Sequence, residues 1–161
     1  MSIGFLIKKI IVPVVLFVSC NIVDAQQKIK TINIDGEKFV EVTVDILIFF
    51  LDQKYIDWET DMKKLGFKVL DEQENVAIYY KESKGSIMQC ISKNKLGIVS
   101  IDWYDYKTKK SLMSEVFEVI KPYYYAREDD IDFYEYKSWI IGATIQKDTD
   151  FTFNRILIKK Q

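Results

Sequence analysis

Short runs in which apolar and polar residues alternate predict several antiparallel strands along this chain. Residues 28–43 alternate around Asp35-Gly36, a dipeptide typical of tight turns, and predict a β-hairpin. Further runs, separated by short polar turns, predict two sets of three strands. These strands are expected at residues 76–81, 86–92 and 96–104, and at residues 131–137, 139–146 and 151–159.

Helical spacing of apolar residues predicts a helix before each set of strands. Residues 55–65 carry apolar side chains on one face of such a helix. A second pattern of this kind begins near Ser111 and is disrupted near its end by Pro122. Thr43 is a suitable N-cap for a further helix at residues 44–51, although the apolar residues of this stretch also fit a buried strand.

The main body of the chain is thus expected to run from a helix to three strands, and then to a second helix and three more strands. We expect an α+β fold, in which helices pack on one face of an antiparallel sheet or sheets. Residues 78–83 resemble residues 133–138 and favour two helix-plus-three-strand halves, although chance alternation of apolar residues explains this equally well. Because no stretch is linker-like or of low complexity, residues 26–161 are expected to form one domain.

The amino-terminal segment, residues 1–25, has the pattern of a secretory signal peptide. Two lysines precede an unbroken apolar run at residues 10–18, which is too short to cross a bilayer as a helix. Alternatively, the residues before Cys20 resemble a bacterial lipoprotein box, in which residues 1–19 are the signal and Cys20 is lipidated. Both alternatives predict a protein outside the cytoplasm, which is periplasmic, secreted or anchored to a membrane by its lipid.

Composition narrows the classes of partner. The net charge is −1, with 23 basic and 24 acidic residues, and no basic stripe is present that would neutralise phosphates, so nucleic acid is not expected as a partner. The many Lys, Ile, Asn and Tyr residues are typical of a bacterial protein from an AT-rich genome. Cys90 is the only thiol of the mature chain if cleavage follows Ala25, and its apolar neighbours predict a buried position on a strand.

The residue types present exclude most catalytic designs. The chain has no histidine, which excludes Ser-His-Asp and Cys-His nucleophilic sites and nearly every zinc site. Its six glycines stand singly, so the sequence contains no glycine-rich phosphate loop and no dinucleotide fingerprint. We therefore expect neither a metal nor a cofactor, and we do not expect an enzyme.

Carboxylates are the remaining candidates for chemistry. Residues 128–132 form the densest acidic run, but they lack the ligand spacing of a calcium loop and are expected to form a solvated loop. Asp102 and Asp105 flank Trp103 and Tyr104, and an acid pair beside aromatic rings suits a small carboxylate-dependent hydrolase. This alternative requires that the two carboxylates face each other across a concave pocket.

Clustered aromatic residues predict a binding surface. Three consecutive tyrosines follow the end of a predicted helix, and a second aromatic group ends a predicted strand. One helix cannot hide three consecutive rings, and exposed Tyr and Trp are favoured at interfaces. The alternative is that the rings cover the core with only their polar atoms exposed. The predicted binding residues are Trp103, Tyr104, Tyr106, Tyr123, Tyr124 and Tyr125.

These observations predict a non-enzymatic, protein-binding module of the bacterial envelope or of the secreted fraction, with another envelope or secreted protein as its partner. Two alternatives stay open. One is the hydrolase described above, and the other is a carrier that holds an apolar ligand between its helices and its sheet. The carrier requires a sizeable lined cavity. Contact with a membrane is expected only through the signal segment or through a lipid at Cys20.

Overall fold

The computed structural model describes residues 29–105, 113–147 and 151–161 of the chain. The predicted signal segment, which includes Cys20, lies outside the described residues, and so does Tyr106. The strands are β1 (Thr31–Ile34), β2 (Glu37–Val40), β3 (Lys68–Gln73), β4 (Val76–Ser83), β5 (Ser86–Asn94), β6 (Ile98–Asp105), β7 (Tyr124–Glu128), β8 (Ile131–Tyr136), β9 (Trp139–Lys147) and β10 (Thr152–Lys160). The helices are α1 (Val44–Asp52), α2 (Tyr55–Lys64), α3 (Ser114–Ile120) and the short 3-10 helix η1 (Lys121–Tyr123).

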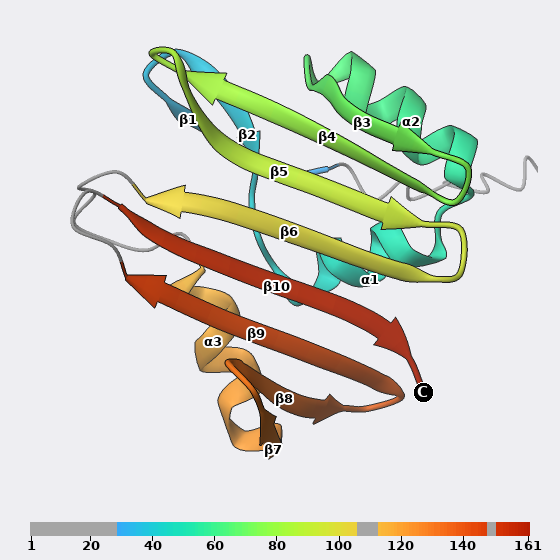
Figure 1. Cartoon of the computed structure of the whole chain (residues 1–161), viewed down its shortest axis with the longest axis vertical. Helices are drawn as coiled ribbons and strands as arrows, with labels where there is room; N and C mark the ends of the chain where they lie inside the picture. Colours follow the sequence, from blue (N-terminus) through green and yellow to red (C-terminus); the bar gives the residue numbers. More distant parts are fainter. Residues whose placement is uncertain (1–28, 106–112, 148–150) are drawn as a thin grey trace, which may run out of the picture.

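One antiparallel sheet of eight strands dominates the structure (Figure 1), in the order β3-β4-β5-β6-β10-β9-β8-β7. It consists of two four-stranded meanders, β3 to β6 and β7 to β10, which join where β6 pairs with β10. Strands β1 and β2 form a separate hairpin. The outer strands of the large sheet are therefore β3 at one edge and β7 at the other.

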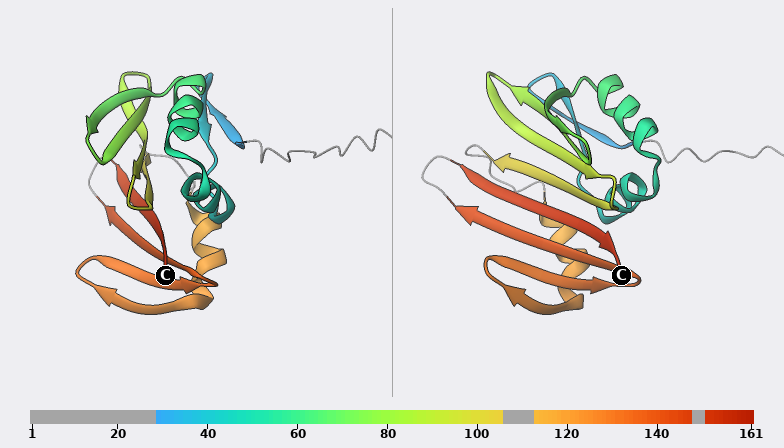
Figure 2. Two further views of the ribbon diagram at one scale, coloured as in Figure 1. Left: turned by 90° about the vertical axis from the view of Figure 1, so that its right-hand side faces the viewer. Right: turned by 45° about the vertical axis from the view of Figure 1, so that its right-hand side comes forward.

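The expectation of an α+β fold with two helix-plus-three-strand halves is wrong. Strands account for 55% of the described residues and helices for 23%, so the structure is mostly antiparallel β. The three α-helices have 9, 10 and 7 residues and cover the sheet only in part (Figure 2), so they do not form a continuous layer. Each set of strands contains four members rather than three.

The two strands absent from the prediction are the two edges of the sheet. Strand β3 has the sequence KVLDEQ, and all six of its residues are exposed. Strand β7 is also largely exposed, and both strands carry a register shift opposite their neighbour. Edge strands have no buried face that would impose alternation, and bulges break their pattern further. The other predicted strands, the first hairpin and the helices after Thr43, at Tyr55 and before Pro122 are confirmed.

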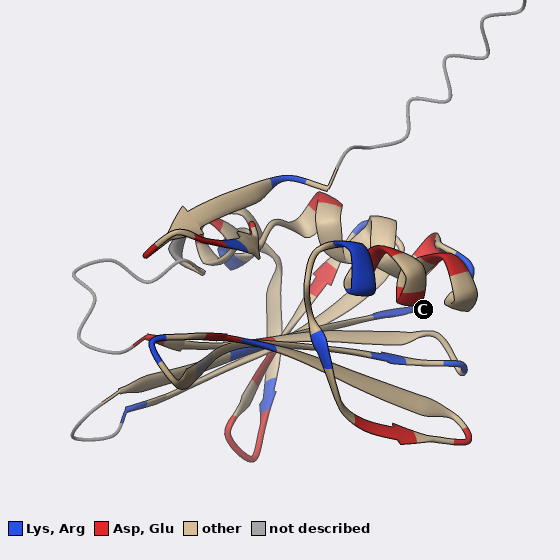
Figure 3. Cartoon of the chain, turned by 90° about the horizontal axis from the view of Figure 1, so that it is seen from above, with Lys and Arg blue, Asp and Glu red and all other residues tan. Residues whose placement is uncertain are grey.

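The core lies between the sheet and one layer of short elements, the helices and the first hairpin. Figure 3 shows this arrangement with the sheet viewed edge-on. Trp103 of β6 is fully buried and meets Phe39 of the hairpin edge to face, with ring centroids 5.3 Å apart. Trp58 of α2 makes the same kind of contact with Tyr79 of β4, also at 5.3 Å. The other face of the sheet has no helix over it in the described part of the chain.

Two buried polar side chains connect these elements to the sheet. The amide of Gln89 on β5 accepts a hydrogen bond from the backbone N–H of Val40 at 3.0 Å and donates one to its carbonyl at 2.9 Å. The ammonium of Lys93, also on β5, donates to the carbonyl oxygens of Phe50 and Gln53 at the end of α1. Burial lowers the pKa of Lys93.

No helix of the described residues is long and apolar enough to span a membrane.

Candidate functional site

The structure separates the predicted aromatic surface into two parts. Trp103 is 0% exposed and donates its indole N–H to Asp105 at 2.6 Å, so it belongs to the core. Tyr104 points to the opposite face of the sheet, where its ring contacts Phe151 and Phe153. Only the three consecutive tyrosines remain as an exposed group within the described residues.

These tyrosines form a row that we call the tyrosine edge, defined as Tyr123, Tyr124 and Tyr125. They are 44%, 53% and 51% exposed. Tyr123 ends η1, and the other two begin β7, the outermost strand of the sheet. The tyrosine edge thus lies where the large sheet ends.

Each ring of the tyrosine edge rests against an aromatic ring of β8. Centroid distances are 5.0 Å from Tyr123 to Tyr136, 5.9 Å from Tyr124 to Tyr134, and 6.3 Å from Tyr125 to Phe133. Such contacts hold one side of each ring in place and leave the other side in solvent. The sequence placed the three tyrosines together but could not show that the aromatic residues of β8 support them.

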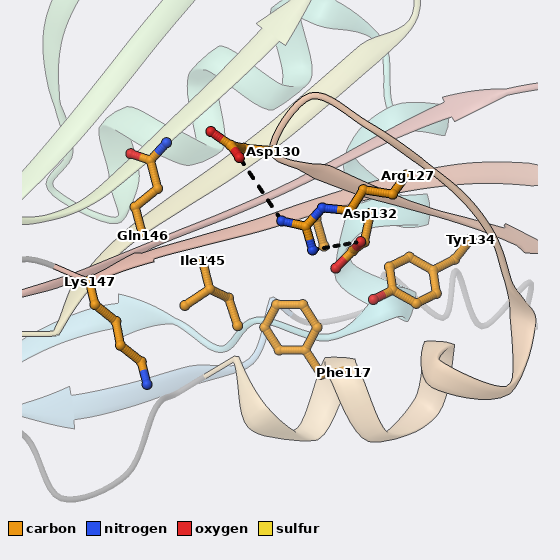
Figure 4. A pocket seen from close by; sticks show the side chains of 9 residues that line it. Phe117, Arg127, Asp130, Asp132, Tyr134, Ile145, Gln146 and Lys147 are labelled. Carbon is orange, nitrogen blue, oxygen red and sulfur yellow. Dashed lines mark hydrogen bonds and ion pairs between the residues drawn. The ribbon is translucent and has the colours of Figure 1, made fainter.

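A cavity of about 520 Å³ adjoins the tyrosine edge between α3 and strands β7 to β9 (Figure 4). Its volume lies in the range of small-ligand and side-chain pockets. Phe117 of α3 and Ile145 of β9 supply its apolar surface, and charged side chains surround them. The lining residues are Phe117, Arg127, Asp130, Asp132, Tyr134, Ala143, Ile145, Gln146 and Lys147.

The acidic run at residues 128–132 contributes to this cavity as an ion-pair cluster. Arg127 lies 3.4 Å from the carboxylate of Asp132 and 4.0 Å from that of Asp130 (Figure 4). A guanidinium between two carboxylates offsets the negative charge that would attract a calcium ion. Among the residues that the structure describes, no group of three or more His, Cys, Asp or Glu side chains is placed to hold a metal.

The two carboxylates of the hydrolase alternative do not meet. Asp102 and Asp105 are three positions apart on β6, and alternation along a strand sends them to opposite faces of the sheet. Asp102 forms a two-fold hydrogen-bonded ion pair with Arg155 of β10, with both N···O distances 2.8 Å. Asp105 accepts hydrogen bonds from Trp103 and from Asn154. The concave acid pair that a hydrolase requires is therefore not formed by these residues.

Cys90 lies on the face of the sheet that carries Asp102. It is buried on β5, as its apolar neighbours predicted. Burial raises the pKa of the thiol from 9.0 to about 11, the nearby Asp102 carboxylate adds to this shift, and Arg155 opposes it. The thiol is thus protonated at neutral pH, and a protonated thiol is a poor nucleophile.

Several cavity residues had no signal in the sequence. Phe117 lies within the predicted helix as an ordinary apolar residue, and Ile145 lies on a predicted strand. They become neighbours only because α3 lies against the face of the sheet to which Tyr134 and Ile145 point. Comparison with family models, with curated proteins and with solved structures found no match to this chain. The site is therefore interpreted from its geometry alone.

Proposed function

We propose that this protein is a non-enzymatic binding module that acts outside the cytoplasm and captures another envelope or secreted protein through the tyrosine edge and the adjoining cavity. The observation that carries the proposal is the row of three half-exposed tyrosine rings, each held against a ring of β8. A second part of the proposal, export, rests on the signal pattern of residues 1–25.

Supported rings favour binding for an energetic reason. A tyrosine offers a large contact area with only two side-chain torsions to fix, and a ring that already rests on a neighbour loses still less entropy when a partner arrives. The cavity beside the rings then provides a recess for one side chain of the partner. A ring row next to a recess is the arrangement typical of interface hot spots.

The edge strand itself is a poor template for an added strand. The register shift between Tyr124 and Ala126 interrupts the regular ladder of β7, and such bulges protect sheet edges from pairing with other chains. Tyr124 rests on Tyr134 at the cavity side of the sheet, whereas Tyr125 rests on Phe133 at the other side. We therefore propose recognition through side chains that straddle the edge.

Export predicts a shortened amino terminus on native material. Intact-mass analysis of the protein purified from its own cells is expected to show a chain that begins at Gln26, or a lipid-modified chain that begins at Cys20. Fractionation should place it outside the cytoplasm. An intact Met1 on the bulk of the native protein would contradict this part of the proposal and leave the tyrosine edge to be tested separately.

The tyrosine edge predicts a specific crosslink. A photoreactive phenylalanine analogue at Tyr124 or Tyr125 is expected to yield one discrete adduct in living cells, because both rings are about half exposed. For the partner identified in this way, the Tyr124→Ala/Tyr125→Ala variant should bind at least tenfold more weakly, since buried interface tyrosines commonly contribute a factor of this size or more. Calorimetric titration of the purified pair measures the loss.

The opposite edge of the sheet supplies the matched control. Val69 and Leu70 on β3 are 44% and 52% exposed, so a Val69→Ser/Leu70→Ser variant changes a comparable edge surface. It should bind the partner as the unaltered protein does, and an analogue at Leu70 should give no adduct of that mass. Equal loss of binding in both variants, or crosslinking from both edges alike, would rule out the tyrosine edge as the binding surface.

A further inference from the structure

A second cavity lies at the other end of β9, where β9 begins and β10 ends. Its volume is about 390 Å³, within the range of sites that hold small ligands. It lies between the end of α1 and the end of the sheet, and it is separate from the tyrosine edge. The lining residues are Leu51, Asp52, Leu96, Gly97, Ile98, Trp139, Lys159 and Lys160.

The helix side of this cavity is fixed by a buried cation. Lys93 donates hydrogen bonds to the carbonyl oxygens of Phe50, Leu51 and Gln53, which are the groups left unpaired at the end of a helix. Helix α1 ends at Asp52, and its last two residues, Leu51 and Asp52, line the cavity.

A fixed turn forms the opposite wall and holds an apolar side chain in solvent. Leu96 is 82% exposed, more than any other large hydrophobic side chain in the described residues. Its backbone N–H donates to the side chain of Asn94, and the N–H of Gly97 donates to the carbonyl of Asn94 at 3.1 Å. Gly97 has a φ of +89°, which favours glycine at this position. The turn thus presents Leu96 beside Ile98 and Trp139 in a set geometry.

The charge at the rim of the cavity is positive. The strand register places Lys159 opposite Ile98 and Lys160 opposite Trp139. In the part of the chain that the structure describes, neither lysine takes part in an ion pair. Asp52 is the one acid of the lining, so the two lysines leave a net charge of +1 there. A positive rim beside an apolar recess complements a ligand that has an apolar body and an anionic head.

We propose that this cavity binds a single acyl chain with an anionic head group. The chain would lie against Leu51, Leu96 and Trp139. Lys160 lies on the face of Trp139 and Lys159 on the face of Ile98, so the head group would lie between the two lysines at the end of β10. Free fatty acids and anionic lipids share this chemistry, and the test below distinguishes the two sources. The site does not rest on the tyrosine edge, because the two cavities lie at opposite ends of β9, with Trp139 and Ile145 roughly 20 Å apart at about 3.3 Å per residue.

Tryptophan fluorescence gives a direct test. Of the three tryptophans, Trp58 and Trp103 are fully buried in the core, and Trp139 lines the cavity. Monomeric 12-bromododecanoate, whose bromine quenches indoles on contact, is expected to quench the emission of Trp139 in a saturable manner. The Trp139→Phe variant should lose the saturable quenching while calorimetry still detects binding of dodecanoate.

The role of the lysines is tested with a matched pair of variants. The Lys159→Gln/Lys160→Gln variant should bind dodecanoate roughly 2- to 30-fold more weakly, the range expected from two exposed ion pairs, and should bind uncharged dodecanol as the unaltered protein does. Lys63→Gln/Lys64→Gln removes two consecutive lysines from the end of α2 and should bind both ligands normally. Circular dichroism checks that both variants are folded.

Three results would overturn the proposal. The first is absence of saturable quenching at concentrations below micelle formation. The second is equal affinity for dodecanoate and dodecanol in the unaltered protein, which would remove the anionic head from the recognition. The third is binding to vesicles of anionic phospholipid without any binding of monomeric dodecanoate, because that result would assign the patch to a membrane surface instead of an acyl-chain site.

Discussion

Trp103→Ala is expected to destabilise the protein by about 3–5 kcal/mol, the range measured for large-to-small changes at buried aromatic residues. The indole is fully buried on β6, meets Phe39 edge to face and donates to the carboxylate of Asp105. Removing it leaves a cavity in the core and takes a hydrogen-bond donor from a buried acid. Urea unfolding followed by far-UV circular dichroism measures the loss, which corresponds to a fall in Tm of roughly 10–20 °C.

Tyr104→Ala is the matched control, because Tyr104 is the next residue along β6 and points to the other face of the sheet. Tyr104→Ala is expected to lower the free energy of unfolding by less than half as much as Trp103→Ala, since the ring of Tyr104 is only partly buried. At a temperature where the Trp103→Ala protein is still folded, that protein should bind the partner of the tyrosine edge as the unaltered protein does. A stable Trp103→Ala protein that has lost partner binding would show that the core assignment of Trp103 is wrong.

The interior of the fold could be predicted from the sequence because buried strands impose a pattern. Strands β4, β5, β6, β9 and β10 each have a face that packs on the core, and this constraint appears as alternation. Thr43 similarly marked the start of α1, where its hydroxyl accepts a hydrogen bond from the N–H of Ile46. The two strands that were not predicted are β3 and β7, whose exposed residues carry no such constraint.

The error at the edges also explains the error in fold class. When the two edge strands are omitted, each half of the chain contains three strands, and the helices then account for a larger share of the structure. With β3 and β7 included, the chain forms a single eight-stranded sheet, and the short helices are minor elements upon it. The two halves are joined by the pairing of β6 with β10. Residues about fifty positions apart form these pairs, and no local sequence pattern indicates such a pairing.

The candidate site shows the same limit. Clustering of Tyr123 to Tyr125 is visible in the sequence, and so is the acidic run that follows. The rings that support the tyrosines, Tyr134 and Tyr136, lie further along the chain on β8. Arg127 adjoins the acidic run, but its pairing with Asp132 depends on the turn that sets β7 against β8. The sequence also paired Trp103 with Tyr104 as one surface, although neighbours on a strand face opposite ways.

Gln89→Leu is expected to destabilise the protein by about 2–5 kcal/mol, although the substitution places an apolar side chain in an apolar core. The amide of Gln89 satisfies both backbone groups of Val40, and all of these atoms are buried. Leucine removes both partners, and each buried backbone group left unpaired costs about 1–3 kcal/mol. Gln73→Leu on the exposed strand β3 is the control and should change the stability by less than about 0.5 kcal/mol. Urea unfolding of the three proteins at pH 7 measures both effects.

Gln89→Glu separates hydrogen bonding from side-chain size, because its stability should depend on pH. An ionised carboxylate at this position accepts from the N–H of Val40 but cannot donate to its carbonyl, whereas the protonated acid does both. Burial next to a carbonyl raises the pKa of the new carboxyl in the folded protein above its unfolded value. The contribution of the protonated acid is therefore complete below the unfolded pKa and is lost as pH rises through the folded pKa. The difference in unfolding free energy between Gln89→Glu and the unaltered protein should accordingly shrink from pH 8 to pH 5. A difference that is the same at both pH values would show that the two hydrogen bonds to Val40 do not hold the first hairpin to the sheet.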